Sequence, residues 1–210
     1  MPPSRRPPLV LVVLDGWGDN PEPGGNAIRQ ARTPVYRELR DRYPSSRLTT
    51  CGEAVGLPPG QMGNSEVGHM NLGAGRIVFQ DLTRIDQAIA RDGLAGNLPL
   101  STLLDSCTGG GRTLHLVGLL SDGGVHSHQR HLHALVRLAA RRGVTRVLAH
   151  AVTDGRDTAP NGGVEYLAAL RRCFADAGVG RIATVSGRYY AMDRAHRWER
   201  TRLAWEAMAR

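Results

Sequence analysis

Three short apolar runs decide the fold class of this chain: TLHLVGLL at 113–120, RVLAHAV at 146–152 and RIATV at 181–185. Each has the length and the Val, Leu or Ile content of a β-strand. Amphipathic stretches at about 128–142 and 164–177 separate them, and each stretch ends at a glycine. Strands that alternate with helices of this length indicate βαβ units, so the sequence predicts an α/β fold with a doubly wound parallel sheet.

A polar, glycine-containing cluster follows each of these predicted strands. Consecutive strand ends lie on the same edge of a parallel sheet, so we expect the clusters to converge in one crevice. The side chains expected there are His126, Arg156, Asp157, Arg188 and Arg194. Three guanidiniums and an imidazole suit a small anion with carboxylate or phosphate groups, because arginine grips such groups through a planar fork of donors. Asp157 either orients a guanidinium or accepts a proton from a ligand that shields it from solvent.

The N-terminal region contains a further apolar run, LVLVVL at 9–14, which predicts another strand buried in a parallel sheet. Asp15 follows at the carboxyl end of this run, where α/β sheets place ligand and metal contacts, or else it only caps the turn. Thr33 and Pro34 predict the start of a helix that Pro44 ends. Apolar spacing predicts another helix at 81–90.

The segment Gly60–Gly75, GQMGNSEVGHMNLGAG, is too rich in glycine and polar side chains to be ordinary core. It contains Ser65 at its centre, near the start of a possible short helix, and His69 close by. A long irregular segment inside a compact domain is usually functional or disordered. We therefore expect the chemistry of the chain to lie here.

The composition places limits on the partners. The net charge is +8 and all 27 basic residues are arginine, but they are spread along the chain without a basic run, so we expect no nucleic-acid partner. There is no lysine for a P-loop, and no predicted strand is followed by G-x-G-x-x-G.

The cysteines and the apolar runs exclude further classes. Cys51, Cys107 and Cys173 lie far apart, which supports neither a zinc site nor a disulfide framework. Arg5 and Arg6 precede an apolar run that is too short for a signal peptide, and no stretch has the length of a membrane span. A cytoplasmic enzyme or binding protein is the expectation.

Four histidines lie close together, at positions 126, 128, 131 and 133. On the predicted helix His133 shares a face with arginines while His128 begins the buried stripe, so the four cannot all meet at one ion. A metal-dependent hydrolase that uses His126 and His128 remains an alternative.

Long motifs across the chain resemble one family, the 2,3-bisphosphoglycerate-independent phosphoglycerate mutases. In the first part they are LDGWG at 14–18, NAI at 26–28 followed by Thr33-Pro34, GQMGNSEVGH at 60–69, GAGR at 73–76 and QDLTRI at 80–85. In the second part they are LLSDGGVHSH at 119–128, DGRDT at 154–158 and GRYYAMDR at 187–194.

The resemblance implies a fold and a set of roles. It implies the start of an alkaline-phosphatase-like metal-binding domain at 1–78 and a phosphotransferase domain at 79–210, both incomplete. Ser65 would take phosphate from phosphoglycerate as phosphoserine and return it to the other hydroxyl of the glycerate. Asp15 and Ser65 would bind one of two divalent metals, most often Mn²⁺. The residues that would hold the substrate are His126, Arg156, Asp157, Arg188 and Arg194.

The resemblance also implies what this chain lacks. Members of the family are more than twice as long and monomeric, and their remaining metal ligands, a lysine and further arginines lie beyond the matching region. We therefore expect an N-terminal fragment with little or no mutase activity of its own. Two other interpretations are an anion-binding module without catalysis, and a metal-dependent phosphatase or sulfatase relative that shares Asp15 and Ser65 but has no use for the arginines of the second domain.

Overall fold

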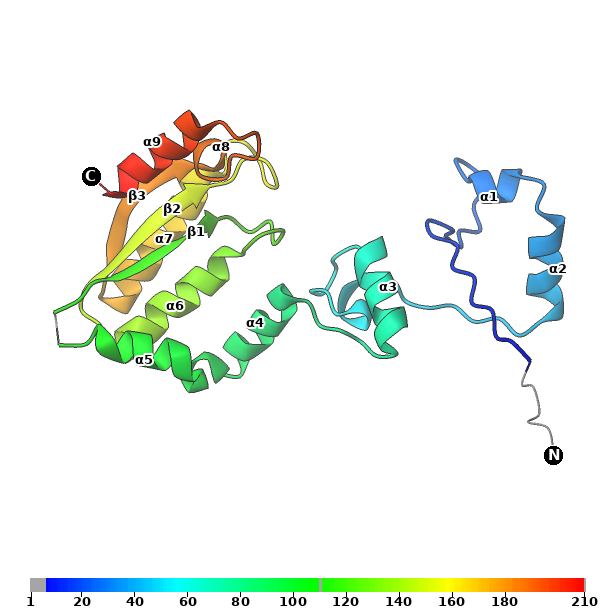
Figure 1. Ribbon diagram of the computed structural model, residues 1–210, viewed down its shortest axis with the longest axis horizontal. Coiled ribbons are helices and arrows are strands. Elements are labelled where there is room, and N and C mark those ends of the chain that lie inside the picture. Colours follow the sequence, from blue (N-terminus) through cyan, green and yellow to red (C-terminus); the bar gives the residue numbers. More distant parts are fainter. Residues whose placement is uncertain (1–6, 110, 210) are drawn as a thin grey trace. The chain divides into compact units, whose positions relative to one another are not determined.

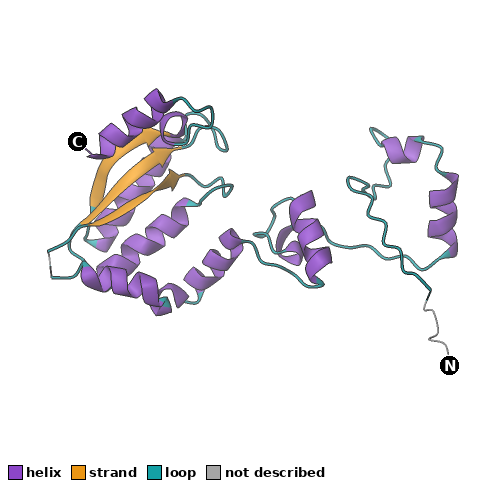
Figure 2. Ribbon diagram, in the orientation of Figure 1, coloured by secondary structure: helices purple, strands orange, loops and turns teal. Residues whose placement is uncertain are grey.

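The computed structural model describes residues 7–109 and 111–209, in two compact units that divide between Phe79 and Gln80. Figure 1 labels the helices and strands along the chain, and Figure 2 separates helix, strand and loop. The described strands all lie in the second unit. No helix in the described part of the chain has both the length and the apolar character needed to cross a membrane.

The second unit is built on a parallel sheet in the order β1-β2-β3. The strands are β1 (Leu114–Leu120), β2 (Val147–Thr153) and β3 (Arg181–Gly187), and α6 (Gln129–Arg141) and α7 (Gly163–Ala177) connect them. The predicted α/β class with βαβ units is confirmed, and the predicted strands and helices agree with these bounds to within a few residues. All three strands point toward the same end of the sheet (Figure 1).

One face of this sheet forms the main core. Leu120 of β1, Val136 of α6 and Leu170 of α7 are each 0% exposed and belong to one cluster of buried side chains. Because side chains alternate between the two faces of a strand, His115 and Val117 of β1 lie on the opposite face and are exposed. The core therefore lies between the sheet and its connecting helices, and it holds the strand ends in place.

The second unit contains further helices. The helix predicted at 81–90 is present as α4 (Asp81–Ala90), followed by η2 (Gly93–Gly96). The helix α5 (Leu98–Ser106) was not predicted, although Asn97 caps it by accepting a hydrogen bond from Leu100 N. After β3 come α8 (Arg188–Ala191) and α9 (Trp198–Ala209), and α9 packs beside β3.

The first unit has a small core. It contains α1 (Ala27–Gln30), α2 (Pro34–Arg42), η1 (Gly52–Val55) and α3 (Ser65–Ala74), so the helices predicted after Thr33 and near Ser65 are confirmed. Its cluster of buried side chains consists of Val55, Leu57 and Val67. Asn71 ties the segments together: its Nδ2 donates to the carbonyls of Val55 and Val67, and its Oδ1 accepts from Val78 N at 2.6 Å.

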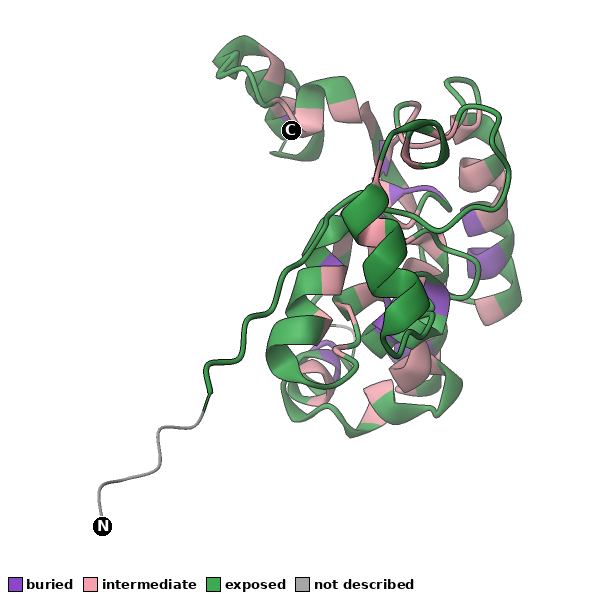
Figure 3. Cartoon of the chain, turned by 90° about the vertical axis from the view of Figure 1, so that its right-hand side faces the viewer, coloured by how far each residue is buried: buried purple, intermediate pink, exposed green. Residues whose placement is uncertain are grey.

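The buried strand predicted at 9–14 is absent, and this prediction was wrong. Residues 9–14 form no regular element, each of them is between 44% and 97% exposed, and the segment is exposed throughout in Figure 3. A strand is stabilised by pairing with neighbouring strands, and the described residues of the first unit contain no other strand. Asp15 consequently lies in an exposed turn rather than at the end of a sheet strand.

Candidate functional site

Ser65 is the first residue of α3, and its hydroxyl contacts the Asp15 carboxylate. Asn64 caps the helix by accepting a hydrogen bond from Val67 N, so the helix begins at a defined residue. Ser65 Oγ donates to Asp15 Oδ2 at 2.8 Å, across 50 positions of the sequence. The structure thus brings together the two residues that the sequence singled out in this unit.

His69 lies one helical turn after Ser65, on the same face of α3. Its Nδ1 is 2.8 Å from the Ser65 carbonyl oxygen and 3.2 Å from Ser65 Oγ. The hydroxyl therefore lies between a carboxylate and an imidazole. His69 was not among the predicted site residues, although its i, i+4 spacing from Ser65 on a predicted helix was a usable signal.

The loop before Ser65 requires glycine at position 63. A Cβ atom on Gly63 would lie 1.7 Å from the carbonyl oxygen of Thr50. That distance is far below van der Waals contact, so only glycine lets these two backbone segments pass each other. The close approach sets the path of the chain two residues before the hydroxyl.

Asp15 and Ser65 fit a divalent cation as part of a ligand set. Carboxylate and hydroxyl oxygens are hard donors of the kind that Mg²⁺ and Mn²⁺ prefer, and these two already lie 2.8 Å apart. Among residues 7–109 and 111–209, however, no group of three or more His, Cys, Asp or Glu side chains is arranged to hold a metal ion. The pair can supply two ligands of a metal site but not a complete site.

In the second unit, Arg188 is held by two aspartates. Arg188 Nη1 donates to Asp154 Oδ1 at 2.8 Å and to Asp157 Oδ2 at 2.6 Å. The side chains of Asp154 and Arg188 are 1% and 10% exposed. His126 Nε2 lies 3.6 Å from the same oxygen of Asp157, so three of the predicted crevice residues are in contact.

Asp154 was not predicted as a site residue, yet it is the most highly connected carboxylate here. Its Oδ1 also accepts from the backbone N–H groups of Arg156 and Asp157, and its Oδ2 accepts from Ser121 Oγ at 2.8 Å. Burial alone would raise the pKa of Asp154, but the hydrogen bonds from Asp157 N–H, Arg188, Ser121 and Arg156 N–H outweigh it. They hold the pKa of this carboxyl far below its ordinary value, so Asp154 is ionised.

A pocket of about 520 Å³ opens beside this cluster. Its lining includes four arginines, at positions 156, 188, 194 and 200. Arg156 and Arg194 are exposed, and neither side chain has an ion pair or hydrogen bond with any described residue. These two guanidiniums are available to an anion, which is the chemistry expected at the strand ends.

Arg200 is a member of this pocket that the sequence did not indicate. It lies on α9, and its guanidinium is 3.9 Å from the centroid of the Tyr189 ring and 3.1 Å from Asp193 Oδ1. Asp193 also accepts from the N–H groups of Ala195 and Arg197, which closes the loop that carries Arg194. Because Arg200 comes from a helix after the strand-end clusters, the strand pattern could not have found it.

The neighbouring histidines have separate partners. His128 accepts from Arg130 N at the start of α6, and His131 pairs with Asp86 of α4, whereas His126 faces Asp157. These contacts agree with the expectation that the run does not converge on one ion. In the part of the chain that the structure describes, they also give no support to the alternative hydrolase site at His126 and His128.

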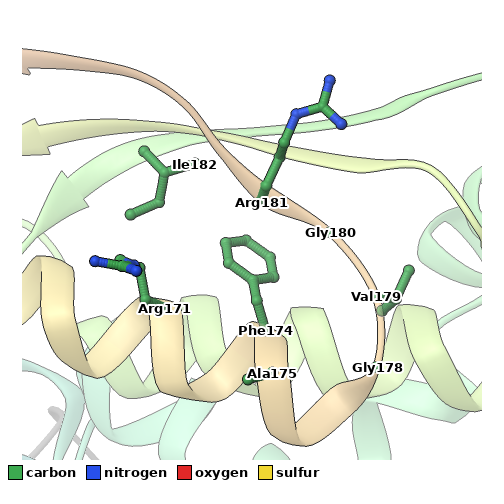
Figure 4. Close-up of a pocket in the computed structure, with 8 residues that line it drawn as sticks. All are labelled: Arg171, Phe174, Ala175, Gly178, Val179, Gly180, Arg181 and Ile182. Carbon is green, nitrogen blue, oxygen red and sulfur yellow. The ribbon is translucent and has the colours of Figure 1, made fainter.

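A second hollow, of about 500 Å³, lies at the amino end of β3. Figure 4 shows Phe174 at its centre, with the side chains of Arg171 and Arg181 pointing in different directions. Because these charges do not converge, we place the anion site at the carboxyl ends of the strands instead.

Comparison with known proteins gives one consistent family. A family model described as "BPG-independent PGAM N-terminus" matches residues 85–210. The 2,3-bisphosphoglycerate-independent phosphoglycerate mutase of Thermomicrobium roseum is 59% identical over 204 residues, covering 97% of this chain and 39% of that protein. The protein of the same name from Syntrophotalea carbinolica is 54% identical, covering 97% of this chain and 40% of that protein.

The structural comparison agrees. The chain is similar to Leishmania mexicana phosphoglycerate mutase, crystallised at low cobalt concentration, with a TM-score of 0.66 and 35% identity. The similarity covers 86% of this chain and 34% of that one. This chain thus spans about two fifths of the length of the curated relatives it matches.

Proposed function

Since this chain belongs to the 2,3-bisphosphoglycerate-independent phosphoglycerate mutase family, we propose that it contributes the nucleophile and the anion pocket for interconversion of 3-phosphoglycerate and 2-phosphoglycerate. We further propose that residues 1–78 are part of the metal-binding domain and 79–210 part of the phosphotransferase domain. The observation that carries the proposal is the contact between Ser65 Oγ and Asp15 Oδ2 at 2.8 Å.

In the first half of the proposed reaction, Ser65 Oγ attacks the phosphorus of 3-phosphoglycerate. A bond from Oγ to phosphorus forms while the bond from phosphorus to the C3 oxygen breaks, and the C3 oxygen takes up a proton. The Ser65 proton points at Asp15 Oδ2, which can accept it. The position of Ser65 at the start of α3 favours the phosphorylated product, because free N–H groups and the helix dipole stabilise an anion there.

In the second half, the C2 hydroxyl attacks the phosphoserine. The C2 hydroxyl gives up its proton as its oxygen bonds to phosphorus, the bond from phosphorus to Ser65 Oγ breaks, and Ser65 Oγ takes up a proton, so no phosphate is gained or lost. The arginine pocket supports this reaction because bound glycerate can be retained between the two transfers.

We propose that two divalent cations, Mn²⁺ in the cell, serve this site, with Asp15 and Ser65 among the ligands of one. A bound cation would lower the pKa of the serine hydroxyl and stabilise charge on the phosphoryl group. The structures of the Leishmania protein were determined at low cobalt concentration, which supports a divalent metal.

The proposal is tested by calorimetric titration of the purified chain with 3-phosphoglycerate. We expect binding by the wild type and loss of binding in Arg156→Ala, because Arg156 is a free guanidinium of the pocket. Arg171→Ala is the matched control, since Arg171 is also an arginine without a described ion pair but lies at the other hollow. Equal binding by both variants, or none by the wild type, would contradict the assignment of the pocket.

A coupled mutase assay with Mn²⁺ separates catalysis from binding. Because the described residues supply only two ligands of a metal site, we expect no turnover from this chain alone. Turnover at ordinary enzyme rates would show that the metal site is complete without further ligands.

A further inference from the structure

We propose that Asp154 is the positioning residue of the arginine pocket: it holds Arg188 by one nitrogen and fixes the loop that carries Arg156. This inference rests on the proposed function of the pocket. Asp154 lies directly after β2, and its carboxylate accepts four hydrogen bonds while its side chain is 1% exposed.

The way in which Arg188 is held leaves most of its donors for a ligand. Asp154 and Asp157 both contact Nη1, and Nε and Nη2 have no partner among the described residues. Those two nitrogens lie on one side of the guanidinium and can grip a carboxylate or phosphate bidentately. The aspartates thus orient the fork without occupying it.

The same carboxylate shapes the adjacent loop. By accepting from the N–H groups of Arg156 and Asp157, Asp154 Oδ1 forms an Asx-type turn that directs both side chains. Ser121, buried at 1% exposed, holds the other oxygen and prevents the carboxylate from rotating. One buried side chain therefore sets the positions of residues from two strand-end loops.

The burial and the charge state of Asp154 agree with this role. Its pKa is held far below the ordinary value by the bonds that define the arrangement, so its acceptor geometry persists at every physiological pH. Both oxygens of Asp154 already accept hydrogen bonds from protein groups, and its side chain is 1% exposed against 18% for Asp157, which separates its role from that of Asp157.

The test compares Asp154→Ala with Asp154→Asn in the purified chain, by titration with 3-phosphoglycerate and by amide hydrogen exchange at Arg156 and Asp157. In the alanine variant we expect affinity to fall by about tenfold or more and both amides to exchange faster, because the acceptor is lost. The asparagine variant keeps Oδ1 as an acceptor, so it should restore amide protection and bring affinity to within about threefold of wild type.

Asp105→Ala is the control, because it removes an exposed carboxylate paired with Arg142 away from the pocket and should leave both readouts unchanged. If Asp154→Ala does not fold, Ser121→Ala takes its place: we expect faster exchange at both amides and about threefold weaker binding. The positioning role would be overturned if the measured variant, Asp154→Ala or Ser121→Ala, bound 3-phosphoglycerate as tightly as the wild type. Wild-type exchange rates at the Arg156 and Asp157 amides would overturn it too. If the wild type does not bind, the proposed function fails, and the exchange rates alone decide the positioning role.

Discussion

Replacing Arg188 with alanine tests how much the stability of the second unit depends on the guanidinium that Asp154 and Asp157 share. The substitution leaves Asp154 and Asp157, with side chains 1% and 18% exposed, without the guanidinium that both contact. Breaking a buried ion pair from one side costs about 3–5 kcal/mol. Asp154 keeps three other hydrogen bonds, so we expect the lower end, about 3 kcal/mol, which corresponds to roughly 12 °C in the melting temperature of a unit of this size.

The destabilisation should depend on pH in a defined direction. The pKa of Asp154 is lowered in the folded state, so its contribution to stability is present above the ordinary pKa of about 3.9 and is lost as the pH falls below that value. In the Arg188→Ala variant, protonation of Asp154 also removes the negative charge that no longer has a cationic partner. The difference in unfolding free energy between wild type and Arg188→Ala should therefore be largest at neutral pH and shrink below about pH 4.

Urea unfolding followed by circular dichroism at pH 7 and at pH 3.5 measures this difference. The double variant Arg188→Ala with Asp154→Asn provides the internal control, because removing the stranded charge should recover part of the lost stability at pH 7. A loss below about 1 kcal/mol at pH 7, or one that is equal at both pH values, would refute the reasoning.

Three other expectations concern the core and the first unit. Leu170→Ala, at a site that is 0% exposed, should destabilise the second unit by about 3–5 kcal/mol in urea unfolding, and a loss near zero would contradict its place in the core. Gly63→Ala should destabilise the first unit by more than about 2 kcal/mol, seen as faster amide exchange at Val67, because its Cβ would meet the Thr50 carbonyl at 1.7 Å. Mn²⁺ should bind weakly, with a dissociation constant of about 1 mM, and Asp15→Ala should abolish the binding in electron paramagnetic resonance titrations; unchanged binding would exclude Asp15 as a ligand.

Local patterns were sufficient for most of the second unit. The strands and their connecting helices follow from apolar periodicity and terminal glycines, and all three strands are present in parallel order. Gly178, where the helix predicted at 164–177 was expected to stop, adopts φ +67° directly after α7. Such signals depend on residues close in sequence, which is why they can be read without the fold.

The segment at 9–14 shows where a local pattern fails. Its composition is that of a buried strand, but burial depends on neighbouring strands that the described part of the first unit does not contain. Arg200 and Asp154 could not be assigned to the site from local patterns for a different reason. A side chain becomes part of a pocket through contacts with residues that are distant in the sequence.

The sequence by itself determined the α/β class, the family and the chemical groups available, because periodicity, turn residues and long motifs are properties of short stretches. Only the tertiary structure decided which groups meet. Ser65 reaches Asp15 across 50 positions, and one carboxylate, Asp154, joins Ser121, the loop at Arg156 and Arg188. Hydrogen bonds act over about 3 Å, so the partner of each group is set by how the chain packs and not by its order in the sequence.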